Sequence, residues 1–508
     1  MLSKKLEDNE RGFFQDLSEE YAHMHIGLLV GQSARRFPDR VFLVSKQREV
    51  TYREFYFRVT RCAQMFAKHG GTSVLLSMEN GFDFYVAYCA ALLAGMVIIP
   101  VNTFLHEQEV VQIIDQVKPS IIMLSPEQRE KYKLFTHSDI NDIDWNEPVP
   151  EKIEDFEDRS FHVPPVDDTA FILFTSGTTG TPKGVMLSSK NVMSNAIQSF
   201  ARMETFGFKD ERFLAALPLF HVFSQMSAIW LPIISCSTII LIKRIERKEL
   251  LEGFAQKPTT FFAVPALFGL LCIMRTCNLD SIKLFVCGAD ALPDKIRDGF
   301  AQLYGRIIAT GYGLSEASPV ISFNAESFFP TSNMVGKPLE GIECLIKNES
   351  GEKVQLGEVG LLWVKGPNIM QGYFAAPEEN SKILVDGWLN TGDYASMDEQ
   401  GRLTIRGREK DLIINKGFKI YPQEVENILM KHPAVFKAAV IGRDNESSGQ
   451  VPIAFVAAKE NYPGLSDELY VLCNQSLAAY KIPKKIIILN DLPMNYTGKI
   501  DKKRLVDA

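Results

Sequence analysis

One ten-residue segment of the chain combines the residue types that bind polyphosphates. It runs from Thr175 to Gly184 with the sequence TSGTTGTPKG, which holds three glycines, five hydroxyl residues and one lysine. Glycine N–H groups approach phosphate oxygens without obstruction, hydroxyl groups donate hydrogen bonds, and one cation balances charge. The segment does not fit the Walker A pattern, because Pro182 stands where that pattern requires glycine. We therefore predict a phosphate-binding loop of another kind, with a Gly/Thr surface turn as the alternative.

Strands are predicted on both sides of this loop. The apolar run at residues 170–174 precedes it, and residues 185–187 follow it before Ser188 or Ser189 begins a helical pattern through Ala201. The loop is therefore expected to join a strand to a strand, whereas a Walker A loop leads from a strand into a helix.

The ten residues of this loop closely resemble the signature loop of the adenylate-forming (ANL) superfamily, which includes acyl-CoA synthetases, firefly luciferase and the adenylation domains of peptide synthetases. The resemblance extends over about residues 50–502, and its motifs occur in the superfamily's order. It implies an α/β fold with a large N-terminal body of two parallel-sheet α/β subdomains and a small β unit, followed by a small mobile α+β C-terminal domain. We place the adenylation body at residues 1–408, its β unit at about 336–406, and the C-terminal lid domain at 409–508.

The resemblance assigns ATP or AMP binding to residues in several motifs of the body. These residues are Thr175, Ser176, Gly177, Thr178, Thr179, Gly180, Lys183, Gly288, Ala289, Gly311, Tyr312, Gly313, Asp393 and Arg408. Asp393 and Arg408 match positions that hold the ribose, and Tyr312 matches a ring that stacks on adenine. Glu316 and Thr175 are assigned to Mg²⁺, which takes one or two carboxylates together with substrate phosphates. Taken alone, Asp393 would be a turn carboxylate and Glu316 a surface carboxylate after a glycine turn.

Three further assignments concern the C-terminal domain. Lys499 matches the superfamily's catalytic lysine, although its position near the C-terminus alone would indicate a solvated side chain. The resemblance implies that domain motion delivers Lys499 to the α-phosphate, where its charge stabilises the attack of a carboxylate, with Lys410 at the hinge. Lys416, Gly417 and Phe418 resemble the CoA-side segment that borders the pantetheine tunnel after rotation, with a glycine turn between strands as the alternative.

A lone histidine in apolar surroundings indicates where the acid binds. His221 would by itself be a satisfied core histidine, but the resemblance places it at the carboxylate's entrance and, with Lys499 and Glu316, among the catalytic residues. Amino-acid-activating domains carry an Asp near this position, whereas residues 213–242 contain no acidic residue, which favours an uncharged acyl tail. The candidate walls of the acyl pocket, which fit a hydrophobic core as well, are Phe220, Phe261, Phe262 and Val264.

The reaction that the resemblance implies has two halves. ATP with Mg²⁺ and a small-molecule carboxylic acid give acyl-AMP and pyrophosphate, and coenzyme A as co-substrate then takes the acyl group and releases AMP. We expect a ligase for medium- or long-chain fatty acids. The alternatives are transfer to an acyl carrier protein's pantetheine, an aryl or short-chain carboxylate–CoA ligase, and a non-enzymatic nucleotide-binding relative. Lys499, Glu316 and Asp393 argue against the last of these.

Composition and charge restrict the other classes of protein to which the chain could belong. A chain of 508 residues is too long for one core, and its net charge of −7 argues against a nucleic-acid partner. The eight cysteines contain no CxxC pair, and residues 1–16 lack the apolar core of a signal peptide, so we expect a cytoplasmic protein. Peripheral membrane association and a homodimer remain open.

One segment is long and apolar enough to raise the question of a membrane span. Residues 213–242 hold no Asp, Glu, Lys or Arg, but Pro218, His221 and Pro232 are among the residues that interrupt them. We therefore predict a buried helix and strand there.

The elements that must position these residues follow from periodicity. Helical and strand-like stretches alternate from residue 50 to 124 and again from 259 to 287, which predicts crossover units around parallel sheets. The phosphate loop, Gly288 and residues 310–313 all follow predicted strands, so they should meet at the carboxyl edge of a sheet. Beyond Arg408, a helix beginning at Pro422 and further strands predict a compact α+β unit.

Overall fold

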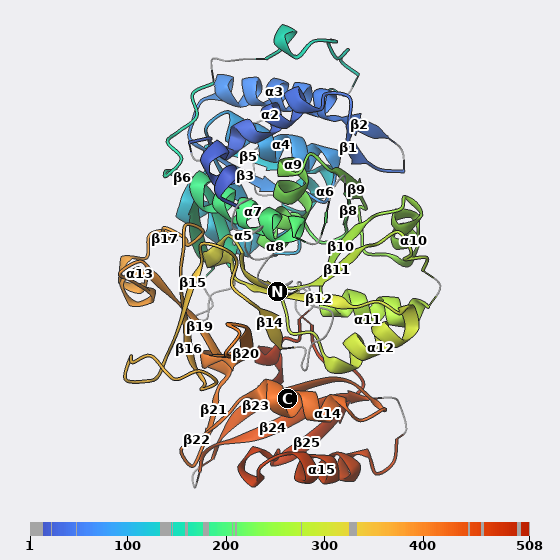
Figure 1. Cartoon of the computed structure of the whole chain (residues 1–508), viewed down its shortest axis with the longest axis vertical. Helices are drawn as coiled ribbons and strands as arrows, with labels where there is room; N and C mark the ends of the chain where they lie inside the picture. Colours follow the sequence, from blue (N-terminus) through green and yellow to red (C-terminus); the bar gives the residue numbers. More distant parts are fainter. Residues whose placement is uncertain are drawn as a thin grey trace.

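Four sheets organise the chain along its long axis (Figure 1). The computed structural model describes residues 14–21, 23–46, 48–132, 144, 146–157, 161–175, 182–205, 207–208, 211–275, 277–324, 333–445, 448–458, 462–494 and 499–506. The first half of the chain lies at the top of Figure 1, and the last hundred residues lie at the bottom.

One six-stranded sheet carries the loop-flanking strands, in the order β17-β7-β6-β4-β3-β5. Strands β3 to β6 are parallel where they pair, and β6 and β7 form an antiparallel hairpin that opposes Thr175 to Lys183. The predicted strand-to-strand connection is therefore present. The elements are β3 Ser73–Ser77, β4 Val97–Pro100, β5 Ile121–Leu124, β6 Thr169–Thr175, β7 Lys183–Ser188 and β17 Gly372–Tyr373, with α3 Tyr52–His69, α4 Phe82–Leu93, α5 Glu107–Val117 and α6 Pro126–Lys131.

An eight-stranded sheet lies beside it in the order β13-β12-β11-β10-β8-β9-β1-β2. Its inner pairs are parallel and its two edge pairs are antiparallel. The strands are β1 Val41–Val44, β2 Glu49–Thr51, β8 Arg212–Ala215, β9 Thr238–Leu241, β10 Thr260–Ala263, β11 Leu284–Cys287, β12 Ile308–Gly313 and β13 Val320–Asn324. The helices are α2 Leu29–Arg36, α7 Ser189–Glu204, α8 Val222–Gln225, α9 Leu231–Ile234, α10 Arg247–Ala255, α11 Pro265–Met274 and α12 Asp294–Tyr304, and η3 Met226–Trp230 is a π-helical turn.

The two parallel-rich sheets share one hydrophobic core. Helix α4 is apolar on all sides, and its residues from Phe84 to Leu93 are buried. The charge-free residues 213–242 contribute β8, three short helical turns and β9, so they form the buried helix and strand expected. No helix in the described part of the chain is long and apolar enough to cross a bilayer.

A third, antiparallel sheet follows in the order β14-β20-β19-β16-β15, with β18 beside β19. Part of the predicted β unit leaves this sheet, because β17 pairs with β7 of the first sheet instead. The elements are β14 Met334–Gly336, β15 Glu343–Lys347, β16 Gly360–Lys365, α13 Pro377–Ile383, β18 Leu384–Val385, β19 Trp388–Met397 and β20 Leu403–Arg408.

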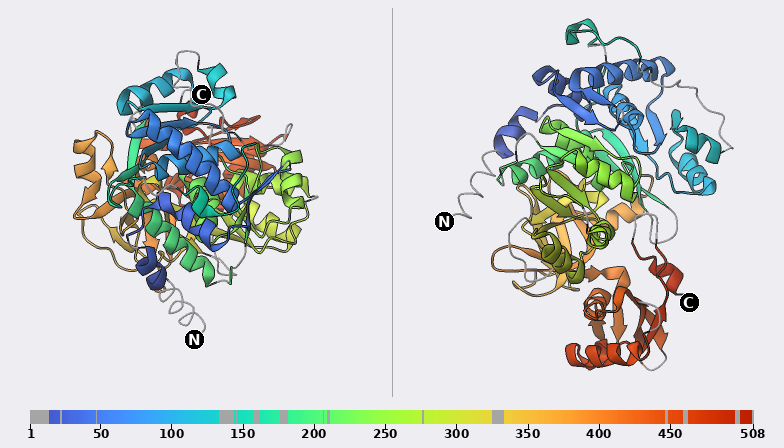
Figure 2. Two further views of the ribbon diagram at one scale, coloured as in Figure 1. Left: turned by 90° about the horizontal axis from the view of Figure 1, so that it is seen from above. Right: turned by 90° about the vertical axis from the view of Figure 1, so that its right-hand side faces the viewer.

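The last part of the chain forms a separate lobe, which Figure 2 shows below the body in its right-hand view. Its sheet has the order β22-β21-β24-β23, with β25 parallel to β24, and it is covered by two helices. The elements are η5 Glu409–Asp411, β21 Ile413–Asn415, β22 Phe418–Ile420, α14 Pro422–Met430, β23 Val435–Asn445, β24 Gly449–Ala458, α15 Leu465–Ser476 and β25 Lys485–Leu489. Its hydrophobic clusters contain residues of this lobe alone, as expected for a unit with its own core. The division that we predict after Arg408 falls at the end of β20.

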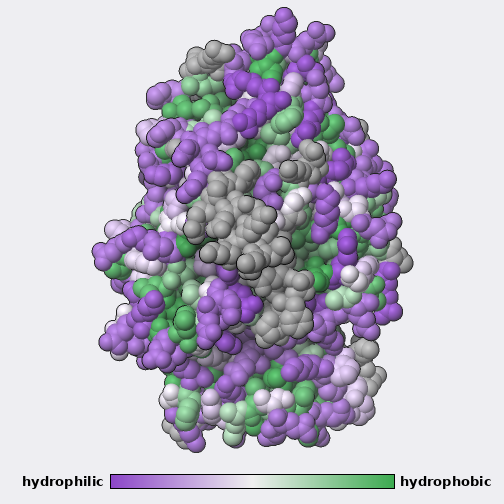
Figure 3. All heavy atoms as spheres, viewed as in Figure 1, coloured by the Kyte–Doolittle hydropathy of each residue, from purple (hydrophilic) through white to green (hydrophobic). Residues whose placement is uncertain are grey.

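The predicted fold class is confirmed by this arrangement of sheets and helices. The face in Figure 3 shows hydrophobic residues in separate groups among hydrophilic ones. Peripheral membrane association and a homodimer stay predictions.

Candidate active site

Predicted nucleotide residues from two sheets lie close together, at the ends of β11 and β12 and in the β19–β20 pair. Residues Gly288 and Ala289 follow β11, Tyr312 and Gly313 end the adjacent β12, and Asp393 and Arg408 belong to β19 and β20. Because β11 and β12 are parallel neighbours, their carboxyl ends lie at one edge of the sheet, as ligand-binding loops of such sheets do.

A buried carboxylate lies at the centre of this region. Asp393 is only 4% exposed and lies directly opposite Arg408 in the β19–β20 pair. Its Oδ1 lies 3.3 Å from Nε of Arg408, and its Oδ2 accepts a hydrogen bond of 2.5 Å from the Tyr312 hydroxyl. Burial raises the pKa of Asp393, and the positive charge of Arg408 and the Tyr312 hydrogen bond oppose that rise. Each carboxylate oxygen keeps a lone pair, so the group can accept from the two hydroxyls of a ribose.

Glu316 and Lys183 belong to a second polar group at the base of the phosphate loop. Glu316 lies in the 3₁₀ turn η4 Ser315–Ala317, and its Oε1 accepts a hydrogen bond of 2.6 Å from the Tyr373 hydroxyl. Lys183 forms an ion pair with Glu379 and lies 5.4 Å from the centre of the Tyr373 ring. The second oxygen of Glu316 suits Mg²⁺, a hard cation that binds carboxylates and substrate phosphates. The charges of Asp393 and Glu316 both raise the pKa of Arg408, so Arg408 lies near both polar groups.

The phosphate loop is described only at its ends. Thr175 and Lys183 are paired residues of β6 and β7. Ser176, Gly177, Thr178, Thr179 and Gly180 lie outside the described residues, so their assignment stays a prediction.

The end of β11 makes room for an aromatic ring. A Cβ on Gly288 would stand 2.8 Å from Cζ of Phe223, and the next residue, Ala289, has the left-handed φ of +66°. The ring of Phe223 meets that of Phe262 edge-on at 6.1 Å, and Phe262 stacks on Phe213 at 6.2 Å. A row of three aromatic rings therefore leads from Gly288 into the core.

His221 is fixed at the start of α8 by the body around it. The Asn80 side chain accepts from the N–H of Leu219 and donates to the carbonyl of Leu217, at 2.9 Å in each case. The Nδ1 atom of His221 accepts from the N–H of Phe223 at 3.2 Å, so its Nε2 carries the proton of the neutral ring. Burial and, to a smaller extent, the positive charge of Lys499 lower the pKa of His221 to about 4. His221 can donate a hydrogen bond at neutral pH but carries no charge there.

Lys499 reaches this region from the C-terminal lobe. Burial lowers the pKa of Lys499, Arg408 and Lys410 lower it further, and the carboxylates of Asp290 and Asp393 oppose that change. Its charge acts on both Asp393 and His221, so its ammonium group lies near these two residues of the body. The lobe therefore places a cation among the predicted nucleotide-binding residues.

The comparisons with known proteins agree with this geometry. The family described as AMP-binding enzyme matches residues 30–374, and the AMP-binding enzyme C-terminal domain matches residues 424–499. The chain belongs to the AMP-binding enzyme family. The adenylate-forming superfamily expected from the sequence is thereby confirmed.

Relatives of different substrate classes lie at similar distances within this family. The chain is 31% identical to a 2-succinylbenzoate–CoA ligase of Bacillus subtilis (strain 168), over 94% of this chain and 97% of that protein. It is also 31% identical to a long-chain-fatty-acid–CoA ligase of the same organism, over 94% and 93%. Among solved structures, the o-succinylbenzoate coenzyme A synthetase of Bacillus subtilis in complex with ATP and magnesium ion is similar, with a TM-score of 0.82, 28% identity, and coverage of 94% and 99%. These matches show an AMP-forming acid–CoA ligase, and ATP, Mg²⁺ and coenzyme A are confirmed as its cofactors and co-substrate.

The AMP-binding enzyme does not bring every predicted residue to this site. Phe261 is fully buried on the other face of β10, among Phe254, Phe268 and Phe285, and Val264 begins α11 beside the same core. Phe220 meets the exposed Phe104 edge-on at 6.3 Å. Only Phe262 of the four predicted wall residues joins the Phe223 ring.

The hinge and CoA-side residues belong to the lobe and its connection. Lys410 is the middle residue of η5, directly after β20. Lys416 and Gly417 form the turn between β21 and β22 with φ of +49° and +81°, and Phe418 stacks on Tyr480 of the same lobe at 4.6 Å. The CoA-side role of this turn stays a prediction for another lobe orientation.

Four residues of the site were not predicted from the sequence. Tyr373 and Glu379 border the phosphate loop, Asp290 faces Lys499, and Phe223 fills the space beside Gly288. Asp290 and Phe223 lie within two residues of predicted site residues, which was the only available signal. Tyr373 gave none, because its strand is only two residues long.

Proposed function

We propose that this enzyme activates a medium- or long-chain fatty acid with ATP and transfers the acyl group to coenzyme A. The observation that carries the proposal is the row of rings formed by Phe223, Phe262 and Phe213, which begins beside Gly288 and continues into the core. A hydrocarbon chain gains about 0.8 kcal/mol for each methylene group that such a surface removes from water.

The charges near these rings support an uncharged tail. His221 is neutral at physiological pH, and residues 213–242 supply no charged side chain. A dicarboxylic acid such as 2-succinylbenzoate would bring a second carboxylate, which needs a cationic partner when it is buried. Lys499 and Arg408 both lie near Asp393, so their charges act at the nucleotide end.

The first half reaction joins the acid to the nucleotide. A carboxylate oxygen attacks the α-phosphorus of ATP, and pyrophosphate leaves with the β- and γ-phosphates. Lys499 stabilises the negative charge that develops there, while Asp393 and Arg408 hold the ribose. Glu316 would hold Mg²⁺, which would neutralise charge on the phosphates.

The second half reaction releases AMP. The thiol sulfur of coenzyme A attacks the acyl carbonyl carbon, the thiol gives up its proton, and the bond to the AMP oxygen breaks. An acyl phosphate anhydride is already a good acyl donor, so this step needs mainly orientation and exclusion of water. We propose that rotation of the lobe about Lys410 removes Lys499 and brings residues 416–418 to the thiol.

An aryl acid is the second candidate substrate class. The 2-succinylbenzoate–CoA ligase is as similar to this chain as the fatty-acid ligase, at 31% identity each. Aromatic rings such as Phe223 and Phe262 can also pack against an aryl substrate. An acyl carrier protein remains an alternative thiol acceptor without a specific contact in its favour.

Acid-dependent ATP–pyrophosphate exchange tests the substrate class. Butyrate, octanoate, palmitate, benzoate and 2-succinylbenzoate would be compared, with coenzyme A and a carrier-protein pantetheine as acceptors afterwards. For the fatty acids we expect kcat/KM to rise roughly fourfold for each added methylene until the pocket is filled. A preference for benzoate or 2-succinylbenzoate over palmitate would contradict the proposal.

A further inference from the structure

A lysine of the body reaches the backbone of the C-terminal lobe. Lys295 lies in the first turn of α12, and its ammonium group donates to the carbonyl oxygens of His432 at 3.2 Å and Pro433 at 3.1 Å. The carbonyl of Val435 accepts a third hydrogen bond from the same group. One ammonium group therefore uses its three donors on three carbonyls of one turn.

The turn that Lys295 binds follows α14. This helix runs from Pro422 to Met430 and β23 begins at Val435, so the three carbonyls lie just beyond the C-terminus of the helix, which carries partial negative charge. A cation at this place satisfies the three oxygens and interacts favourably with the helix dipole. Lys295 thus binds a part of the lobe that favours a positive charge.

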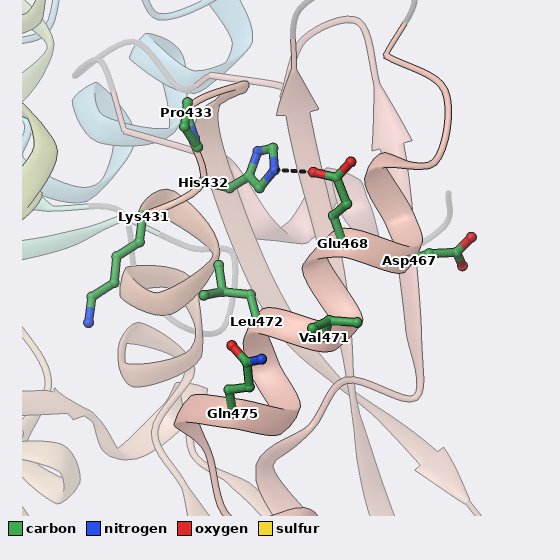
Figure 4. A pocket seen from close by; sticks show the side chains of 8 residues that line it. All are labelled: Lys431, His432, Pro433, Asp467, Glu468, Val471, Leu472 and Gln475. Atoms are coloured by element: carbon green, nitrogen blue, oxygen red, sulfur yellow. Dashed lines mark hydrogen bonds and ion pairs between the residues drawn. The ribbon is translucent and has the colours of Figure 1, made fainter.

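The same turn is fixed within the lobe. Figure 4 shows the His432 ring directed at Glu468 of α15, with a distance of 2.9 Å between Nε2 and the carboxylate. The Nδ1 atom of His432 accepts from the N–H of Ala434 at 3.2 Å. An open pocket of about 420 Å³ beside this turn is lined only by residues of the lobe, so it is separate from the active site. Because His432 of this turn contacts Glu468 of α15, a contact with the turn restrains α15 as well as α14.

Lys295 does not stabilise α12, the helix that carries it. A positive charge in the first turn of a helix is unfavourable for that helix, because the N-terminus already carries partial positive charge. The segment that leads into α12 also contains Asp290, whose charge acts on both Lys499 and Lys502 of the lobe. The stretch from Asp290 to Lys295 therefore contacts the lobe through Lys295, and the charge of Asp290 acts on two lysines of the lobe.

We propose that Lys295 is a positioning residue that holds the C-terminal lobe in the orientation in which Lys499 lies near Asp393. The inference rests on the proposed function, because it assigns this orientation to acyl-adenylate formation. Rotation of the lobe about η5 must break the three hydrogen bonds of Lys295, so the contact favours the first half reaction over the second. Lys419 of the lobe adds an ion pair of 2.7 Å with Glu349 of the body, so Lys295 biases the orientation without being its sole support.

The bias should be modest in size. Hydrogen bonds from a charged donor are stronger than neutral ones, but Lys295 is an exposed residue and water competes for its ammonium group. We expect its loss to shift the balance between the two lobe orientations about fivefold. Such a shift changes the rates of the two half reactions in opposite directions.

Lys295→Met tests the inference, because it removes the charge and keeps most of the side chain. We expect kcat for acid-dependent ATP–pyrophosphate exchange to fall about fivefold, with the KM for ATP and for the acid nearly unchanged. Thioester formation from supplied acyl-adenylate should be unchanged or faster. Lys295→Arg should restore much of the exchange rate.

Arg297→Ala is the matched control on the same helix. Arg297 pairs with Asp294 at 2.9 Å and Asp298 at 2.8 Å, both residues of α12, so it should leave the ratio of the two half reactions unchanged. The inference would be overturned if Lys295→Met catalysed exchange and thioester formation at the rates of the unchanged enzyme. It would also be overturned if both rates fell by the same factor.

A readout of lobe orientation separates this inference from the proposed function. Trypsin cleavage after Arg408 and Lys410 should be faster in Lys295→Met than in the unchanged protein, because a released lobe exposes its connection. If the unchanged protein shows no exchange with any acid, the proposed function fails while this comparison still decides the role of Lys295. Identical cleavage rates would overturn that role.

Discussion

Lys499 is a cation in a place where burial disfavours its charge. Arg408 and Lys410 add repulsion, and Asp290 and Asp393 compensate only in part, so the pKa of Lys499 lies below that of an ordinary lysine. An ammonium group that is poorly solvated by its surroundings interacts strongly with a phosphate that enters beside it. Because Lys499 belongs to the lobe, we expect movement of the lobe to change how strongly this cation acts on the phosphate.

Lys499→Ala should abolish acid-dependent ATP–pyrophosphate exchange and spare thioester formation from supplied acyl-adenylate, because the cation acts only on the phosphate. In the unchanged enzyme, exchange should fall as pH rises through the lowered pKa of Lys499, since the protonated form is the active one. This loss should occur at lower pH than the ordinary lysine pKa of 10.5 would give. Parallel pH profiles and rates for both half reactions would show that Lys499 does not act at this step.

The ends of the strands determine which side chains come together. The sequence predicted the alternation of helices and strands from residue 50 to 124, which includes α4, α5 and β5, because each of these is a short apolar or amphipathic run between clear breaks. It could not separate Phe261 from Phe262, since both are apolar and the alternation of faces along β10 sends only one of them to the Phe223 ring. Nor could it find Tyr373, whose pairing with β7 joins residues almost two hundred positions apart.

The end of β11 leads to a testable prediction about Gly288. Gly288→Ala would place a methyl group 2.8 Å from the Phe223 ring, so the ring must shift along the row toward Phe262. We expect the KM for the preferred acid to rise about tenfold, with a smaller change in the KM for ATP, as measured by exchange kinetics.

Gly299→Ala is the control for this change. Gly299 lies within α12, and a Cβ there meets no atom within 4 Å, so the variant should keep wild-type kinetics and gain up to about 1 kcal/mol in stability. If the two variants have the same KM for the acid, the Phe223 ring does not border the acid.

The whole molecule is a body and a lobe whose relative position sets the chemistry. The pattern beyond Arg408 indicated a second unit, and the resemblance to the superfamily implied that this unit delivers a cationic residue to the body. It could not give the observed orientation, because contacts such as those of Lys295 use backbone carbonyls, which every residue has. The lobe orientation is therefore a property of surfaces that only the folded chain brings together.

Lys410→Pro tests whether the lobe must turn between the two half reactions. Proline fixes φ near −65° at position 410 and restricts Glu409 before it, so η5 should lose the freedom that a hinge requires. We expect ATP–pyrophosphate exchange to stay within about threefold of the unchanged enzyme and thioester formation to fall roughly a hundredfold. Lys410→Ala removes the same charge but leaves the backbone free, so both half reactions should survive in it. Thioester formation that persists in Lys410→Pro, with exchange and thermal unfolding unaltered, would mean that one lobe orientation serves both steps.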